Sequence, residues 1–177
     1  MATLNATNLK HASSGSNNIV LAADGSTTIS NLSNAGKILQ VVQAFKDDVF
    51  TTTSNSFVDI TGLSASITPS SSSSKILVGT NIYVSSGNNV IRVNLVRGST
   101  NIAQPSGSSN NATMQQYEST NNMATASINF LDSPSTTSAT TYKVMVCGTT
   151  GIQVRINEYT GGSYFGVSTL TLMEVAA

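Results

Sequence analysis

Short segments in which apolar and polar residues alternate recur along most of the chain, and this pattern constrains its fold more than any other feature. In residues 75–84 the even-numbered apolar residues share one face of an extended chain, and in residues 90–97 the odd-numbered ones do. Successive side chains of a strand point to opposite faces, so both segments bury one face and expose the other. We predict that they form an antiparallel hairpin around a turn at residues 85–89.

The same analysis predicts strands along the rest of the chain and no helix. Two polar stretches, residues 70–74 with five consecutive serines and residues 98–124, are expected to be loops within the domain, the second with a weak strand at 114–118. Eight or more short strands at this spacing predict an all-β protein, an antiparallel β-sandwich of jelly-roll type rather than a closed barrel. The further expected strands are 37–45, 56–61, 65–68, 125–132, 141–147, 152–157 and 164–175.

Two of the expected strands are apolar on both faces. In residues 141–147 and 167–175, apolar side chains occupy positions of both parities. A strand that is apolar on both faces is buried on both, whereas a two-sheet sandwich buries only one. The second face therefore needs a loop, an arm or a neighbouring subunit, which predicts a homo-oligomer.

The first 36 residues differ from the rest because they contain no aromatic residue. Within them, residues 18–29 are expected to form a hairpin around Asp24-Gly25, a favourable turn dipeptide. Two strands cannot bury a core of their own. We therefore divide the chain into an N-terminal docking arm, 1–36, and a β-sandwich domain, 37–177. The side chains expected to dock the arm on a partner are Leu9, Ile19, Leu21 and Ile29.

The composition excludes several classes of protein. Only 9% of the residues are charged, eight Lys+Arg balance eight Asp+Glu, and Ser, Thr and Asn supply 28, 23 and 18 residues. Without a basic run the chain is not expected to bind nucleic acid. The sequence shows no charged segment followed by an apolar one, the pattern of a signal peptide, so no signal peptide is expected. No apolar run is long enough for membrane insertion. Synthesis in a host cytoplasm followed by exposure in a virion agrees with both features.

Residues for catalysis or metal binding are sparse. Cys147 lies in an expected strand, where a buried small hydrophobe is the simplest interpretation, and His11 lies in the polar arm. No pair of Cys or His has metal-ligand spacing, and no pair of carboxylates forms a recognisable catalytic constellation. We expect a non-enzymatic protein without a metal or a cofactor.

A small aromatic group is the remaining candidate for binding. Tyr159, Tyr164 and Phe165 flank Gly161-Gly162. They either pack in the core at the ends of strands or form a loop that contacts a receptor or partner. The sequence leaves both interpretations open.

Several segments resemble structural proteins of tailed phages, notably phages of marine bacteria and cyanobacteria. Asn8–Gly25 resembles the N-terminal segment of such proteins, and Gly36–Gln43 resembles the junction that follows it. Phe57–Val78, Leu95–Ser99 and Phe130–Pro134 are similar to the distal β-domain of fibre-type proteins. The resemblance implies a non-enzymatic virion part, usually a homotrimer, whose arm docks on other virion proteins and whose head serves host attachment or fibre assembly.

Within this class the chain is short, since no shaft of repeats separates the arm from the head. A short tail fibre or a tail or collar accessory is therefore the first interpretation, with a host-surface glycan or protein as a further partner. A capsid decoration or head-fibre protein is the alternative. From another class, a glycan-binding β-sandwich module of a bacterial surface protein would have the same composition.

Overall fold

A computed structural model describes residues 8–9, 12–13, 15, 19–25, 27–29, 36–106, 111–118 and 122–177. The chain divides into two compact units, Met1–Ala35 and Gly36–Ala177. In the first unit, β1 (Asn8–Leu9), β2 (Ile19–Leu21) and β3 (Thr27–Ile29) form a small antiparallel sheet in that order. The turn between β2 and β3 depends on Gly25, whose φ of 85° favours glycine.

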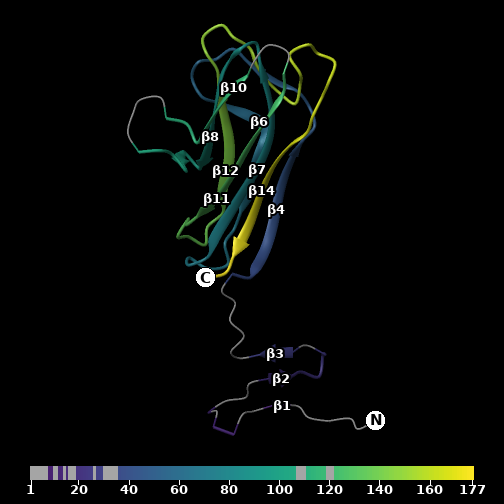
Figure 1. Ribbon diagram of the computed structural model, residues 1–177. Coiled ribbons are helices and arrows are strands. Elements are labelled where there is room, and N and C mark those ends of the chain that lie inside the picture. The colour runs from purple at the N-terminus through teal and green to yellow at the C-terminus, as the bar shows by residue number, and fades with distance from the viewer. Residues whose placement is uncertain are drawn as a thin grey trace. The chain divides into compact units, whose positions relative to one another are not determined.

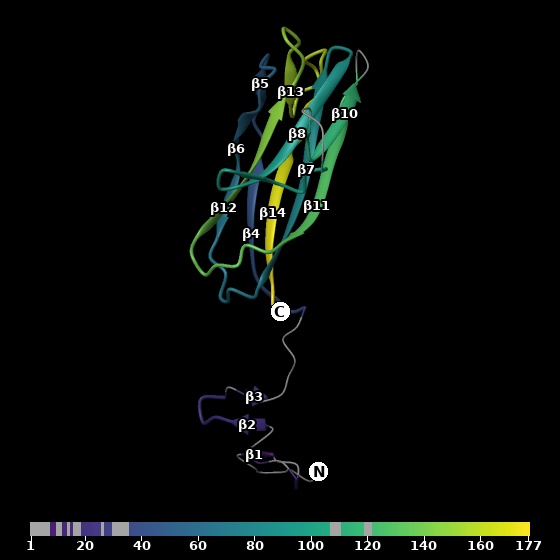
Figure 2. The same ribbon diagram turned by 90° about the vertical axis from the view of Figure 1, so that its left-hand side faces the viewer.

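The second unit consists of two antiparallel sheets packed face to face (Figures 1 and 2). We call them the β4 sheet and the β6 sheet. The main strands of the β4 sheet lie in the order β4 (Ile38–Lys46), β14 (Ser168–Val175), β7 (Lys75–Ser86) and β11 (Ala124–Asp132), and β13 (Val154–Ile156) and β5 (Phe50–Thr52) extend it. The β6 sheet has the order β6 (Val58–Ile67), β12 (Thr140–Cys147), β8 (Asn89–Arg97) and β10 (Met114–Glu118), with β9 (Thr100–Ile102) paired to β8.

The chain passes between the sheets at most connections, and the order of the main strands is that of a jelly roll. The predicted all-β sandwich is thereby confirmed. No helix in the part of the chain that the structure describes has the length and apolar character to span a membrane.

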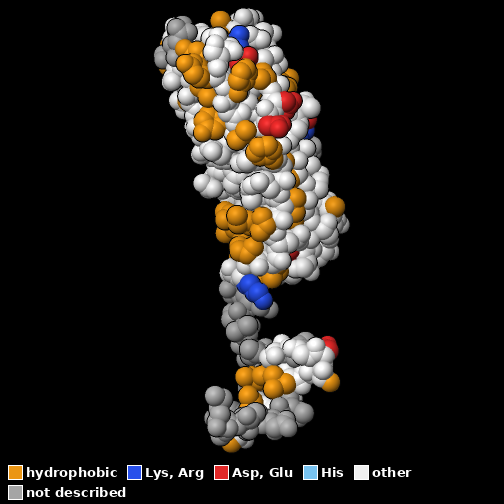
Figure 3. Space-filling model, turned by 90° about the vertical axis from the view of Figure 1, so that its right-hand side faces the viewer, with side chains coloured by type: hydrophobic (Ala, Val, Ile, Leu, Met, Phe, Trp, Pro, Cys, Tyr) orange, Lys and Arg blue, Asp and Glu red, His pale blue; other side chains and the backbone are white. Residues whose placement is uncertain are grey.

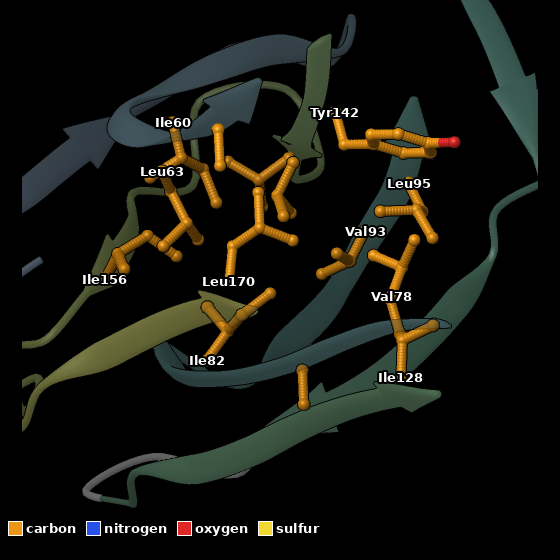
Figure 4. Close-up of a cluster of buried hydrophobic side chains, with 14 of the residues drawn as sticks. Ile60, Leu63, Val78, Ile82, Val93, Leu95, Ile128, Tyr142, Ile156 and Leu170 are labelled. Atoms are coloured by element: carbon orange, nitrogen blue, oxygen red, sulfur yellow. The ribbon is translucent and has the colours of Figure 1, made fainter. Parts of the chain in front are cut away.

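The core lies between the two sheets, where apolar side chains from both inner faces interdigitate (Figure 4). The alternation read from the sequence identified these side chains correctly, since all seven predicted inward residues of 75–84 and 90–97 are fully buried. Cys147 is buried as well, as predicted. The predicted inward residues with no exposed surface are Ile76, Val78, Ile82, Val84, Ile91, Val93 and Leu95.

The predicted pairing of 75–84 with 90–97 is wrong. β7 and β8 follow each other closely, but β7 pairs with β11, β13 and β14, and β8 pairs with β9, β10 and β12. Asn88, with a φ of 61°, lies in the short turn that carries the chain from one sheet to the other. Strands that face each other across a core show the same alternation as strands that pair edge to edge, so the pattern alone does not separate the two arrangements.

Two strand boundaries also differ from the prediction. Residues 56–61 and 65–68 were expected to be separate strands, but β6 runs through Gly62 as one strand. Residues 60–63 of β6 face the single residue Val144 in a bulge, and Gly62 has a φ of 86° there. The last strand was expected from Tyr164, but β14 begins at Ser168, because residues 164–167 form part of a loop.

The five serines at 70–74 form a loop inside the domain, as predicted, and a buried carboxylate fixes this loop. The Glu174 carboxylate accepts hydrogen bonds from the Ser70 backbone amide at 2.8 Å, from the Ser70 hydroxyl at 2.6 Å and from Gln40 Nε2 at 2.6 Å. Burial of the carboxyl raises its pKa, but the hydrogen bonds from Gln40, Ser70 and Ser74 outweigh burial and hold the pKa of Glu174 at about 2. The ionised carboxylate thus joins β14, β4 and the serine loop.

The substitution Glu174→Gln tests this role of the charge. A carboxyl whose pKa is lowered on folding stabilises the native state above its ordinary pKa, near 4.5, and loses this contribution as the pH falls towards 2. We expect the variant to unfold at lower urea concentration than the wild type at pH 7. The difference should shrink between pH 5 and pH 2. A difference in urea midpoint between the variant and the wild type that stays constant across this range would contradict the assignment.

Candidate functional site

One buried asparagine organises the end of the sandwich that carries the aromatic residues. Asn157 is fully buried and has a φ of 64°. Its Nδ2 donates to the carbonyl oxygens of Lys46 at 2.9 Å and Asp48 at 3.1 Å, and its Oδ1 accepts from the Ser168 hydroxyl at 2.5 Å. The backbone amide of Asn157 donates to the Tyr83 carbonyl at 3.0 Å. This residue therefore joins the end of β4, the middle of β7 and the start of β14.

Further hydrogen bonds around Asn157 position the ring of Tyr83 against Gly166. The backbone amide of Tyr83 donates to the Ser168 hydroxyl, and the Gly166 amide donates to the Asn157 carbonyl. A Cβ placed on Gly166 would lie 2.8 Å from Cγ of Tyr83, so only glycine lets the ring pack flat against this backbone.

An open hollow of about 550 Å³ lies beside this ring. Tyr83, Phe165, Gly166 and Val167 supply much of its wall, and the other lining residues are Asp47 and Met123. Phe165 is 64% exposed, so its ring is available to a ligand. The hollow is of a size that binds small molecules, and its wall is largely apolar.

The three aromatic residues considered as a candidate receptor or partner loop lie together, and one of them, Phe165, lines this hollow. Tyr159 and Tyr164 pack edge to face with ring centroids 5.6 Å apart, and Tyr164 is 67% exposed. The Tyr159 amide donates to the Tyr164 carbonyl, and the Tyr159 ring covers Gly161. Residue 158 forms an isolated bridge with Phe165. The loop is thus held by its own backbone, and two of its three aromatic rings face solvent.

Asp47 is the acidic group of the hollow. Its carboxyl is exposed, whereas the neighbouring Asp48 is paired with Lys46 at 2.6 Å. The hydrogen bond from Lys46 lowers the pKa of Asp48. Tyr83 and Asp47 were not predicted as site residues, because the pairing of β14 with β4 and β7 brings these distant segments together, and the sequence does not show that pairing. The exposed acidic pair after β4 was the one available signal.

A second surface is the outer face of the β4 sheet. Leu131 on β11 lies opposite Leu77 on β7, Leu77 lies opposite Met173 on β14, and Met173 lies opposite Val41 on β4. We call these four residues the apolar belt. Leu131 and Val41 are more than half exposed, and Leu77 and Met173 are partly exposed. In Figure 3, which faces this sheet, hydrophobic side chains gather near the end where β4 begins and again in the opposite half.

The outer face of the β6 sheet differs because the chain covers part of it. β9 pairs with β8 in the sheet, and the segment after it covers part of the outer side, where Val96 is buried. Asn94, also on that side, is buried and accepts hydrogen bonds from Gln104 Nε2 and the Thr113 amide. Farther along this face Lys143 and Asp59 form an ion pair. Within the second unit, the described residues do not cover the apolar belt in this way.

The candidate docking residues belong to the first unit and are described within that unit. Leu9 and Leu21 are 40% and 42% exposed in the small sheet of the first unit, and Ile19 is half-buried there. Ile29 lies in β3, while the side chain of Ile29 and all of His11 fall outside the described residues. Burial raises the pKa of the Cys147 thiol, which keeps it protonated. Among the residues that the structure describes, no cluster of His, Cys, Asp and Glu could hold a metal ion.

A buried polar cluster near the start of β12 has a structural role. The Tyr142 hydroxyl donates to Asp132 at 2.6 Å, and Arg97 Nη1 donates to both carboxylate oxygens of Asp132 at 2.8 and 2.9 Å. Burial raises the pKa of Tyr142 far above its usual range, and the adjacent Asp132 adds to this shift. The cluster connects β8, β11 and β12.

No family model and no curated protein sequence matches the chain. Solved structures that match include the infectious bursal disease virus Gx strain, at a TM-score of 0.45 and 13% identity over 81% of this chain and 38% of that chain. T=1 particles derived from the same virus match at 0.44 and 14% identity, over 85% and 39%. A VP2 subviral particle of this virus matches at 0.41 and 14%, over 81% and 38%. The chain spans about two fifths of their length, and at this similarity no function is carried over.

The substitution Asn157→Ala tests the central hydrogen bonds of the site. The variant loses the two hydrogen bonds that Nδ2 donates to carbonyl oxygens, and the Ser168 hydroxyl loses its acceptor. It also places alanine at a positive φ. We therefore expect a loss of about 3–5 kcal/mol in unfolding free energy. Urea unfolding measures this loss. Asn157→Gly tolerates the φ but lacks the hydrogen bonds, and should recover only about 1 kcal/mol of it. Full recovery by glycine would show that the side-chain hydrogen bonds contribute little.

Proposed function

We propose that the chain is a non-enzymatic structural protein of a virion, a short tail fibre or a tail or collar accessory of a tailed phage. In this proposal, residues 1–36 dock on other virion proteins, and the β-sandwich is displayed for host attachment or fibre assembly. The resemblance of several segments to phage structural proteins supports it, as does a surface rich in Ser, Thr and Asn.

The observation that carries the proposal is the uncovered apolar belt, because a protein that works by assembly needs such a surface. On the outer face from Lys75 to Gly79, across all four strands, Lys75 is the only charged residue, and it donates to the Ser133 hydroxyl. Subunits related by symmetry bring like residues together near the axis, and an uncharged face avoids repulsion between them.

The belt and the hollow occupy different parts of this face. Leu77 of the belt and Tyr83 of the hollow are six residues apart on β7, or about 20 Å along the strand, so a contact at the belt leaves the hollow outside it. We therefore propose that copies of the chain associate through the apolar belt, with the homotrimer implied by the resemblance as the assembly.

The substitution Met173→Asp tests this contact. It introduces a charge in the middle of the belt on a half-exposed side chain, so the fold should survive while the assembly dissociates. We expect light scattering after size exclusion to change from about 55 kDa, three times 18.3 kDa, to the mass of a single chain.

The control for this experiment is Ser64→Asp, which adds the same charge to an exposed position on β6 in the other sheet. It should leave the mass and the circular dichroism spectrum unchanged. A wild-type protein that is already a monomer, or an unchanged mass for Met173→Asp, would contradict the proposed contact.

The arm is tested by deletion of residues 1–36. The β-sandwich has its own core, so the truncated chain should fold and show the circular dichroism spectrum of a β-protein. It should fail to join particles when supplied in place of the full chain, because the docking side chains are gone. Incorporation of the truncated chain, measured by mass spectrometry of purified particles, would contradict the docking role.

A further inference from the structure

We propose that the hollow beside Phe165 binds an uncharged sugar residue of a glycan. The proposal rests on the attachment role given to the β-sandwich above and names the chemistry of its ligand. The site combines an exposed aromatic surface, an unpaired carboxylate and an oriented amide, which are the groups that a pyranose ring engages.

Tyr83 and the backbone at Phe165 are held in place before any ligand binds. Tyr83 packs against Gly166, whose missing Cβ makes room for the ring, and the backbone of Phe165 is held at an isolated bridge while most of the side chain is exposed. The C–H face of a sugar packs against such rings, and burying it removes apolar surface from water. Because Tyr83 is already positioned, its contact with a sugar costs little conformational entropy.

The polar part of the site supplies acceptors and donors for hydroxyl groups. The exposed Asp47 carboxylate lines the hollow, and it forms no ion pair with the described residues. One row along the outer face from Tyr83, Oδ1 of the exposed Asn81 accepts a hydrogen bond from the Ser127 hydroxyl at 2.9 Å. This bond orients the amide, so its NH₂ group remains to donate. Neighbouring hydroxyls of a sugar can donate to the carboxylate and accept from the amide.

Charge and size narrow the class of ligand. The lining residues include one carboxylate and no Lys or Arg, which disfavours acidic sugars, phosphates and carboxylates. A volume of about 550 Å³ accommodates one or two sugar rings and is large for a single ammonium group. A cation would also be attracted by aromatic rings and a carboxylate, so the experiment includes a cationic probe.

Saturation-transfer NMR on the full chain tests the proposal with glucose, galactose, mannose, N-acetylglucosamine and N-acetylgalactosamine, each at about 10 mM because a single-sugar site binds near the millimolar range. We expect transfer to the ring protons of at least one sugar. Phe165→Ala should abolish this transfer, and Asp47→Asn should weaken the affinity about tenfold. The matched controls Tyr117→Ala and Asp59→Asn change an exposed ring and an exposed carboxylate of the other sheet, and should bind as the wild type does.

Failure to bind any of the five sugars would overturn the proposal, as would equal transfer in Phe165→Ala and the wild type. Saturation transfer to tetramethylammonium, with no transfer to any sugar, would overturn the proposal in favour of a cation site. These outcomes are separate from failure of the proposed function, which is judged by the mass of the assembly and by incorporation into particles. A sugar-binding chain that never joins particles would leave the hollow assigned and remove the virion role.

Discussion

Burial of alternating apolar side chains between two sheets is the constraint on which the rest of the structure depends. Each main strand contributes one face to this layer, and the chain crosses between the sheets at most connections, so segments distant in sequence meet in the core. With few charges available, polar side chains then fix the connections. Asn157 joins three strands beneath the hollow, and Glu174 holds the serine loop.

The alternation in the sequence was sufficient to identify the strands that build the core and the faces that they bury. The alternation could not identify which strands pair with each other. Val84 and Ile91 face the same core from different sheets, and their alternation would be the same if they lay in one sheet. The aromatic loop was visible as a cluster of rings around two glycines. The hollow beside the loop was not predicted. Asp47 and Tyr83 reach it through the pairing of β14 with β4 and β7 and through hydrogen bonds of Asn157, and no pattern in the sequence marks these contacts.

The strands that are apolar on both faces receive two different explanations. On β12, Cys147 is buried by the chain itself, and on the neighbouring β8 the segment after β9 covers Val96. On β14 the outer residue Met173 continues into the apolar belt, which the described residues of the second unit leave open. A sandwich that covers one outer face and leaves the other open has one surface prepared for copies of itself, while its aromatic loop stays free to meet a ligand.

Methionine oxidation tests this asymmetry most directly. Met173 and Met145 are both half-buried on outer faces, Met173 in the β4 sheet and Met145 in the β6 sheet. With dilute peroxide, mass spectrometry of the native protein should show rapid conversion of Met145 to the sulfoxide and strong protection of Met173, because another copy covers it. Similar rates at the two methionines would show that the β4 sheet is open to solvent and would contradict the account.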